Sequence, residues 1–160
     1  MSSSTTVMLI PDRTYTRARP KTKDHHLSVA FFGVDLRPEL VADLRGVCRL
    51  VASRINGPIA AEANGIGIFN ANNDGFAVVD LIDGIGTLMV RNMFEDVYRN
   101  STSGLQIDTT HGFTPHITRE YLSKEDEFYA SIDPGQIDDL EFNFIAIGVW
   151  SGNERYEVSL

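Results

Sequence analysis

The chain has 160 residues, 42% hydrophobic and 22% charged, which is enough for one globular domain with a sizeable core. Its formal net charge of −8 disfavours binding to long DNA or RNA, because such proteins neutralise many phosphates with Lys and Arg. The single cysteine, Cys48, excludes an internal disulfide and a cysteine-based zinc site. With no signal-like or membrane-spanning segment, we expect one cytoplasmic domain over residues 1–160.

Two strands separated by a basic segment are predicted near the N-terminus. The apolar run Val7–Ile10 ends at a Pro-Asp pair, which is typical of a buried strand closed by a turn. Between Arg13 and Lys23, five side chains are basic and none is acidic. Such charge runs are most often solvated loops. This one immediately precedes the second predicted strand, His26–Gly33, so it is also a candidate for phosphate binding.

The middle of the chain predicts a helix, a hairpin and a second helix. The first helix is expected from about Pro38 to Arg54, with Asp35 or a neighbour as its cap. Two strands, at 59–69 and 76–81, are separated by a polar turn. Glycines in the first of them weaken it or let a ligand approach closely. An apolar stripe from Leu88 to Tyr98 indicates a helix that ends near residue 100.

The last third predicts three more strands, at 115–122, 140–150 and 155–160. The order of elements divides the chain into two halves, each with one long helix and one strand that carries a histidine. We therefore predict an α+β fold of two lobes related by a pseudo-twofold axis. Two antiparallel sheets would face each other across a central groove, with the helices outside.

Each of these histidines is followed, two residues later, by a hydroxyl. The two segments are His26-Leu27-Ser28-Val29 and, 90 residues further on, His116-Ile117-Thr118-Arg119. Because side chains alternate between the faces of a strand, histidine and hydroxyl would point the same way. Histidine is suited to both proton donation and proton acceptance, since its unperturbed pKa lies near 6.5. The pair therefore suggests an acid/base site for phosphoester chemistry.

These two segments resemble the double signature of the 2H phosphoesterases, also called the 2′-5′ RNA ligase-like or LigT-like proteins. That signature is His, any residue, Ser or Thr, and usually a hydrophobic residue, in two copies on central strands. The lead-in Phe113-Thr114-Pro115 and the first strand are also similar to the family's. The chain departs from the pattern at Arg119, where a hydrophobic residue is usual, and at Tyr121, where several members have an arginine.

The resemblance implies a metal-independent phosphodiesterase with no cofactor. One of His26 and His116 would activate the nucleophile and the other would protonate the leaving oxygen, while Ser28 and Thr118 hold the non-bridging oxygens. The nucleophile would be water on a 2′,3′-cyclic phosphate or a ribose 2′-hydroxyl. Either histidine can take either role, because the pseudo-twofold makes both assignments reasonable.

The remaining site candidates concern substrate binding and metal binding. Arg119 is either at a sheet edge or a cation turned toward the phosphate, and Tyr121 occupies the position where several family members have their arginine. Tyr15 and Trp150 could stack on a base, as could Tyr156, although a core position is equally compatible with Trp150. A metal site is weakly suggested by one further set of residues, which is His25, His26 and His111 with Asp24 or Asp108.

The resemblance favours a small nucleotide, and above all a cyclic oligonucleotide, as the substrate. Some short 2H proteins of phages degrade cyclic nucleotide signals of bacterial antiviral defence, so a phage anti-CBASS role in the host cytoplasm is one expectation. The alternatives are a 2′,3′-cyclic phosphodiesterase or RNA end-processing enzyme, and a protein that sequesters a nucleotide without cleaving it. No long DNA and no membrane are expected as partners.

Overall fold

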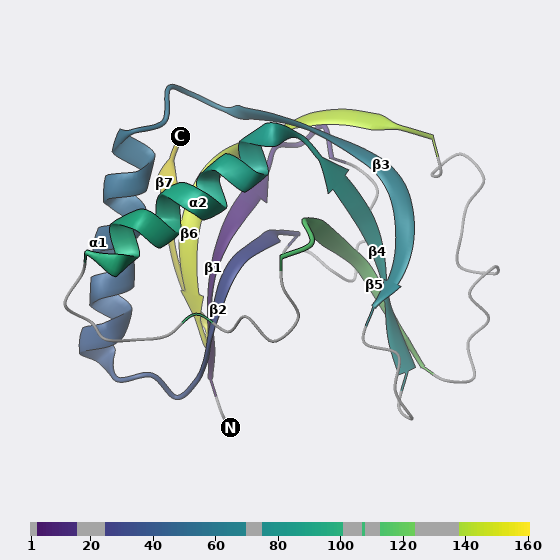
Figure 1. Cartoon of the computed structure of the whole chain (residues 1–160). Coiled ribbons are helices and arrows are strands. Elements are labelled where there is room, and N and C mark those ends of the chain that lie inside the picture. The colour runs from purple at the N-terminus through teal and green to yellow at the C-terminus, as the bar shows by residue number, and fades with distance from the viewer. Residues whose placement is uncertain (1–2, 16–24, 70–74, 101–106, 108–112, 124–137) are drawn as a thin grey trace.

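In a computed structural model of the chain, residues 3–15, 25–69, 75–100, 107, 113–123 and 138–160 are described. They form seven strands and two helices (Figure 1). In chain order the elements are β1 (Ser4–Pro11), β2 (Leu27–Val34), α1 (Pro38–Ser53), β3 (Ile59–Phe69), β4 (Gly75–Asp83), α2 (Ile85–Arg99), β5 (His116–Ser123), β6 (Leu140–Ser151) and β7 (Glu154–Ser159).

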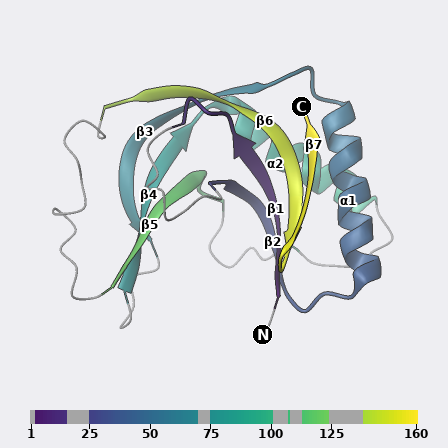
Figure 2. The ribbon, with the colours of Figure 1, turned by 180° about the vertical axis from the view of Figure 1, so that it is seen from behind.

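The described strands form one antiparallel sheet in the order β1-β2-β5-β4-β3-β6-β7, and β1 also pairs with β6. Figures 1 and 2 show the sheet bent into an arch, with β1, β2, β6 and β7 in one limb and β3, β4 and β5 in the other. Strand β6 connects the two limbs, because its first residues pair with β3 and its later residues pair with β1 and β7. The sheet is therefore continuous, whereas two separate sheets were expected.

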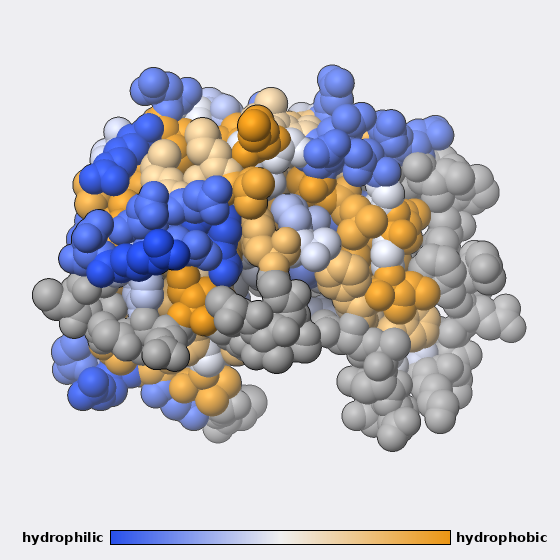
Figure 3. All heavy atoms as spheres, viewed as in Figure 1, coloured by the Kyte–Doolittle hydropathy of each residue, from blue (hydrophilic) through white to orange (hydrophobic). Residues whose placement is uncertain are grey.

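The two helices cover one side of this sheet. Helix α1 packs on β6 and β7 and also contacts α2, which reaches β2 and β3. Both helices are amphipathic, so each turns an apolar stripe to the core, with Leu44 and Val51 of α1 and Val90 and Phe94 of α2 fully buried. In Figure 3, a band of strongly hydrophilic side chains lies on the outer surface where Figure 1 shows α2.

The predicted types and order of the elements are confirmed, with shifts of a few residues at their ends. The predicted cap of the first helix is different. The N-cap is Arg37, which makes no side-chain capping hydrogen bond, while the Asp35 carboxylate accepts a hydrogen bond from the Ser3 amide at 3.0 Å. Neither described helix is long and apolar enough to cross a membrane.

Candidate active site

The two histidine motifs meet where β2 and β5 pair. Leu27 lies opposite Ile117, and both side chains are fully buried in the core. In an antiparallel pair, the neighbours of two opposed residues also oppose one another and point to the other face. His26 is therefore placed across from Thr118, and Ser28 across from His116. We call this side of the sheet the histidine face and the other side, which the helices cover, the helix face.

A β-bulge follows each motif. On β2, Ser28 pairs with Met8 and Ala30 with Val7, so Val29 is the extra residue. On β5, Thr118 pairs with Val79 and Glu120 with Val78, which makes Arg119 the extra residue. Bulges bend a strand and re-aim the side chains beyond them. The two motifs thus share a β-bulge at the same position, one residue after the hydroxyl.

His116 is oriented by its own lead-in segment. Its Nδ1 lies 2.7 Å from the carbonyl oxygen of Thr114. A carbonyl oxygen can only accept, so Nδ1 carries the hydrogen and Nε2 is the nitrogen left to exchange a proton. Phe69, at the end of β3, packs against the ring with 4.5 Å between the centroids. Hydrogen bond and ring contact together fix the direction in which Nε2 points.

His26 has a different aromatic neighbour, Trp150, at 5.1 Å between ring centroids and in an edge-on arrangement. Trp150 reaches the histidine face because it pairs with Thr6, two residues before Met8, the partner of Ser28. The indole nitrogen donates to the Glu157 carboxylate at 3.3 Å. An aromatic ring therefore packs against each histidine, from β6 at His26 and from β3 at His116.

Two of the predicted substrate-binding residues lie elsewhere. Arg119 is only 5% exposed and donates to Asp80 at 2.6 Å, while the buried Tyr15 hydroxyl donates to the other carboxylate oxygen of Asp80 at 2.5 Å. Asp80 pairs with Ile117, which places this network on the helix face. Arg119 is thus neither at a sheet edge nor turned toward the histidines, and Tyr15 is not exposed for stacking on a base.

Tyr121 is on the histidine face because of the bulge at Arg119. It pairs with Ala77, which shares a face with Val79, the partner of Thr118. Its side chain is 72% exposed. Tyr156 is on the opposite face, where the guanidinium groups of α1 residues 45 and 49 lie over its ring.

Three side chains that contact the histidines or their neighbouring residues were missed by the sequence predictions. Phe69 is one, and Arg91 of α2 is another, since it donates to the Val29 carbonyl at the β2 bulge and lies over the Phe113 ring at 5.1 Å. Nothing local in the sequence indicates either contact. The third, Arg155, lies opposite Trp150 across the β6–β7 turn. The tight turn at Gly152 sets the register of this hairpin, so the position of Arg155 opposite Trp150 could have been predicted from the turn.

The predicted metal site falls largely outside the described residues, since Asp24, Asp108 and His111 are not among them. Within the described ranges, no group of three or more His, Cys, Asp or Glu side chains is arranged to hold a metal ion. The basic segment between Arg13 and Lys23 is described only as far as Tyr15.

No family model matches this sequence, and no curated protein matches it. Solved structures do. TT0787 of Thermus thermophilus superposes with a TM-score of 0.56 at 14% identity, over 96% of this chain and 97% of that protein. E. coli LigT in complex with 3′-AMP superposes at 0.55 and 16% identity, over 100% of this chain and 96% of LigT. This chain has the LigT fold. A structure described as a phosphoesterase agrees, with a TM-score of 0.51, 16% identity and coverage of 99% and 95%.

LigT has also been crystallised with NADP+ and with ATP, and both structures match this chain with a TM-score of 0.51. At 14% identity this likeness establishes the arrangement of the elements. Which reaction the site supports depends on the residues of this chain.

Proposed function

We propose that this chain is a metal-independent phosphodiesterase in which His26 and His116 form the acid/base pair. The observation that carries the proposal is the pairing of Leu27 with Ile117, which sets both motifs side by side on one face. Packing of the core alone does not require two histidines and two hydroxyls to lie together on the opposite face of these strands. The LigT fold supports the same conclusion.

In the proposed reaction, one imidazole takes the proton from the nucleophile, which is water or a ribose 2′-hydroxyl. The other imidazole, in its protonated form, gives a proton to the oxygen that leaves phosphorus. Ser28 and Thr118 donate hydrogen bonds to the non-bridging oxygens as negative charge builds there. His116 exchanges its proton through Nε2, because Nδ1 is committed to the Thr114 carbonyl. Each turnover reverses the protonation states of the two rings, and exchange with water restores them.

The proposed substrate is a small nucleotide or cyclic oligonucleotide. The net charge of −8 disfavours long nucleic acids, and LigT itself has been crystallised with 3′-AMP, ATP and NADP+. Degradation of cyclic oligonucleotide signals of antiviral defence is the finer form of the proposal. A 2′,3′-cyclic phosphodiesterase or RNA end-processing enzyme would use the same four residues on a different ligand.

The test is a substrate panel assayed with EDTA present. It contains cyclic di- and trinucleotides, 2′-5′ oligoadenylate and 2′,3′-cyclic mononucleotides, with the products resolved by chromatography. We expect turnover of at least one member, and the product identifies the linkage cleaved. A ligand that is depleted but recovered intact on denaturation would indicate sequestration instead. Activity abolished by EDTA and restored by a divalent cation would contradict the proposed mechanism.

A further inference from the structure

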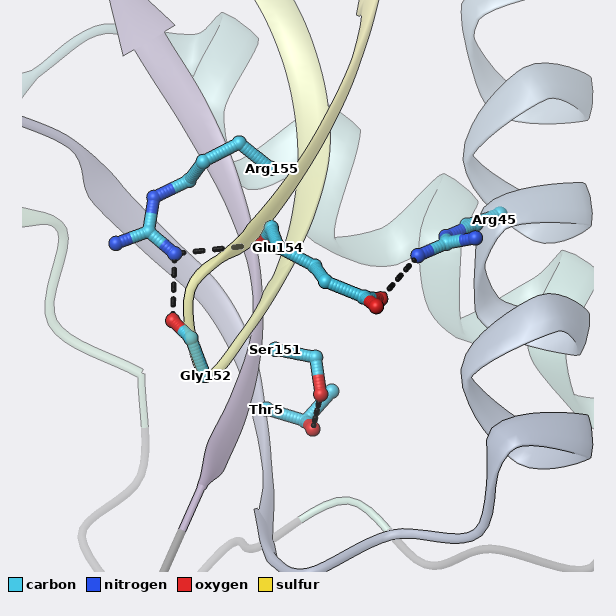
Figure 4. A network of polar contacts seen from close by, with 6 residues as sticks. All are labelled: Thr5, Arg45, Ser151, Gly152, Glu154 and Arg155. Carbon is cyan, nitrogen blue, oxygen red and sulfur yellow. Dashed lines mark hydrogen bonds and ion pairs between the residues drawn. The ribbon is translucent and has the colours of Figure 1, made fainter.

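Strand β7 presents a cation on the histidine face. The turn between β6 and β7 pairs Ser151 with Glu154, and therefore Trp150 with Arg155. Figure 4 shows the consequence for successive side chains, since Glu154 extends to Arg45 on α1 while Arg155 extends to the opposite side of the strand. Arg155 consequently shares the face of Trp150, and through it the face of His26.

The guanidinium of Arg155 is held in a defined place. Its central carbon lies 4.3 Å from the centroid of the Trp150 ring, a cation–π distance. Its Nη1 donates to the carbonyl oxygens of Gly152 at 2.7 Å and of Glu154 at 3.3 Å. These hydrogen bonds and the ring contact position the side chain. The residue as a whole remains exposed.

The cation and His26 contact the same indole ring. Trp150 contacts Arg155 and also His26, at 5.1 Å between the ring centroids. A phosphate undergoing cleavage has to lie within hydrogen-bond reach of the imidazole. The guanidinium is therefore placed for a group beyond that phosphate. The arginine of β5, Arg119, lies on the helix face, buried against Asp80.

We propose that Arg155 binds a second phosphate of the substrate, one that is not cleaved, so that this site selects nucleotides with at least two phosphates. This inference rests on the proposed function, because it takes the bound nucleotide to be the substrate of the enzyme. The planar guanidinium suits a phosphate because it offers parallel N–H donors to two oxygens. The assignment favours an oligonucleotide or cyclic oligonucleotide over a 2′,3′-cyclic mononucleotide.

The test compares adenosine 3′-monophosphate with adenosine 3′,5′-bisphosphate, which differ only by the second phosphate. Calorimetric titration of the full chain measures both affinities for the wild type, R155Q and R45Q. Trp150 is the only tryptophan, so its fluorescence gives an independent signal at the site. Arg45 is the matched control because it also makes a hydrogen bond in this hairpin region and lies over an aromatic ring, but on the helix face.

We expect the wild type and R45Q to bind the bisphosphate about tenfold more tightly than the monophosphate, and R155Q to lose most of that preference. The preference should also shrink as salt is raised, because the contact is exposed. The proposal is overturned if the wild type binds both ligands equally or neither, or if R155Q weakens both to the same extent. Wild-type preference for the bisphosphate without turnover of any phosphodiester would instead overturn the proposed catalysis and leave Arg155 as a ligand contact.

Discussion

The two faces of the sheet are built from the same strands but hold different chemistry. On the helix face, Leu27 and Ile117 are fully buried beneath a core to which α1 and α2 contribute. On the histidine face, the residues that alternate with them are two imidazoles and two hydroxyls, all partly exposed. A strand thus combines a rigid scaffold with a reactive surface at no cost in chain length, because neighbouring residues point opposite ways.

One buried ion pair, Asp80–Arg119, departs from this division. Asp80 and Arg119 are charged, yet they lie on the helix face at 1% and 5% exposure and are joined to Tyr15. Their pairing is needed because an isolated charge in such a place would be strongly destabilising. Arg119 is also the bulge residue next to Thr118, so the ion pair fixes the backbone at the point where the second motif ends.

The largest effect we predict comes from breaking this buried pair. R119M should lower the free energy of unfolding by about 3–5 kcal/mol, because it leaves the buried Asp80 carboxylate without its cation. Chemical denaturation measures this. The matched control is R45M, which removes the more exposed Arg45–Glu154 pair at 2.8 Å and should change stability by less than about 1 kcal/mol. Adding D80N to R119M should restore part of the loss, and an R119M protein as stable as the wild type would contradict the account.

On the histidine face, removal of a single hydroxyl should act on turnover rather than on stability. T118V keeps the shape of the side chain but deletes the donor, so we expect kcat to fall by about a hundredfold with little change in the denaturation midpoint. S28A should behave similarly. Thr6, on the same face but beside Trp150 in the sheet, is the control, and T6V should retain wild-type kcat. Equal losses in T118V and T6V would remove the special role assigned to the motif hydroxyls.

A third effect is expected at Cys48, a buried residue of α1. Burial raises the pKa of its thiol to about 12 from an ordinary 9.0, although nearby Arg49 opposes the shift. At pH 8 a thiol reagent should therefore label the folded chain far more slowly than the chain in urea, and this single cysteine reports all labelling. Because the unfolded thiol ionises first, stability should decline as pH rises from 9 toward 12. Fast labelling of the folded chain would contradict the buried position of Cys48 on α1.

The sequence predicts the elements and the sharing of a face within each motif because both depend on local periodicity. Alternation alone places His26 with Ser28 and His116 with Thr118. The mutual placement of the two motifs requires the β2–β5 register, which no local pattern encodes. A one-residue slip would turn the histidine and hydroxyl of one strand to the other face.

Two of the four predicted substrate-binding residues, Arg119 and Tyr15, lie on the helix face, and the sequence could not show this for the same reason. Nothing near Arg119 in the sequence shows that its partner is Asp80, 39 residues earlier, or that Tyr15 completes the network. The bulge that separates Arg119 from Tyr121 is likewise set by β4, the partner strand. The position of Arg155 could have been predicted from the turn that precedes it, whereas the contacts of Phe69 and Arg91 depend on how the sheet and α2 assemble.

The most direct test of the central claim is the turnover of H26A, H116A and the double variant on the best member of the substrate panel, with folding verified by circular dichroism. Each single variant should lose at least about a hundredfold in kcat, because half of a proton-transfer pair is gone. The double variant should fall little further, since the two groups act as a unit. A single histidine variant that keeps near-wild-type turnover would contradict the account.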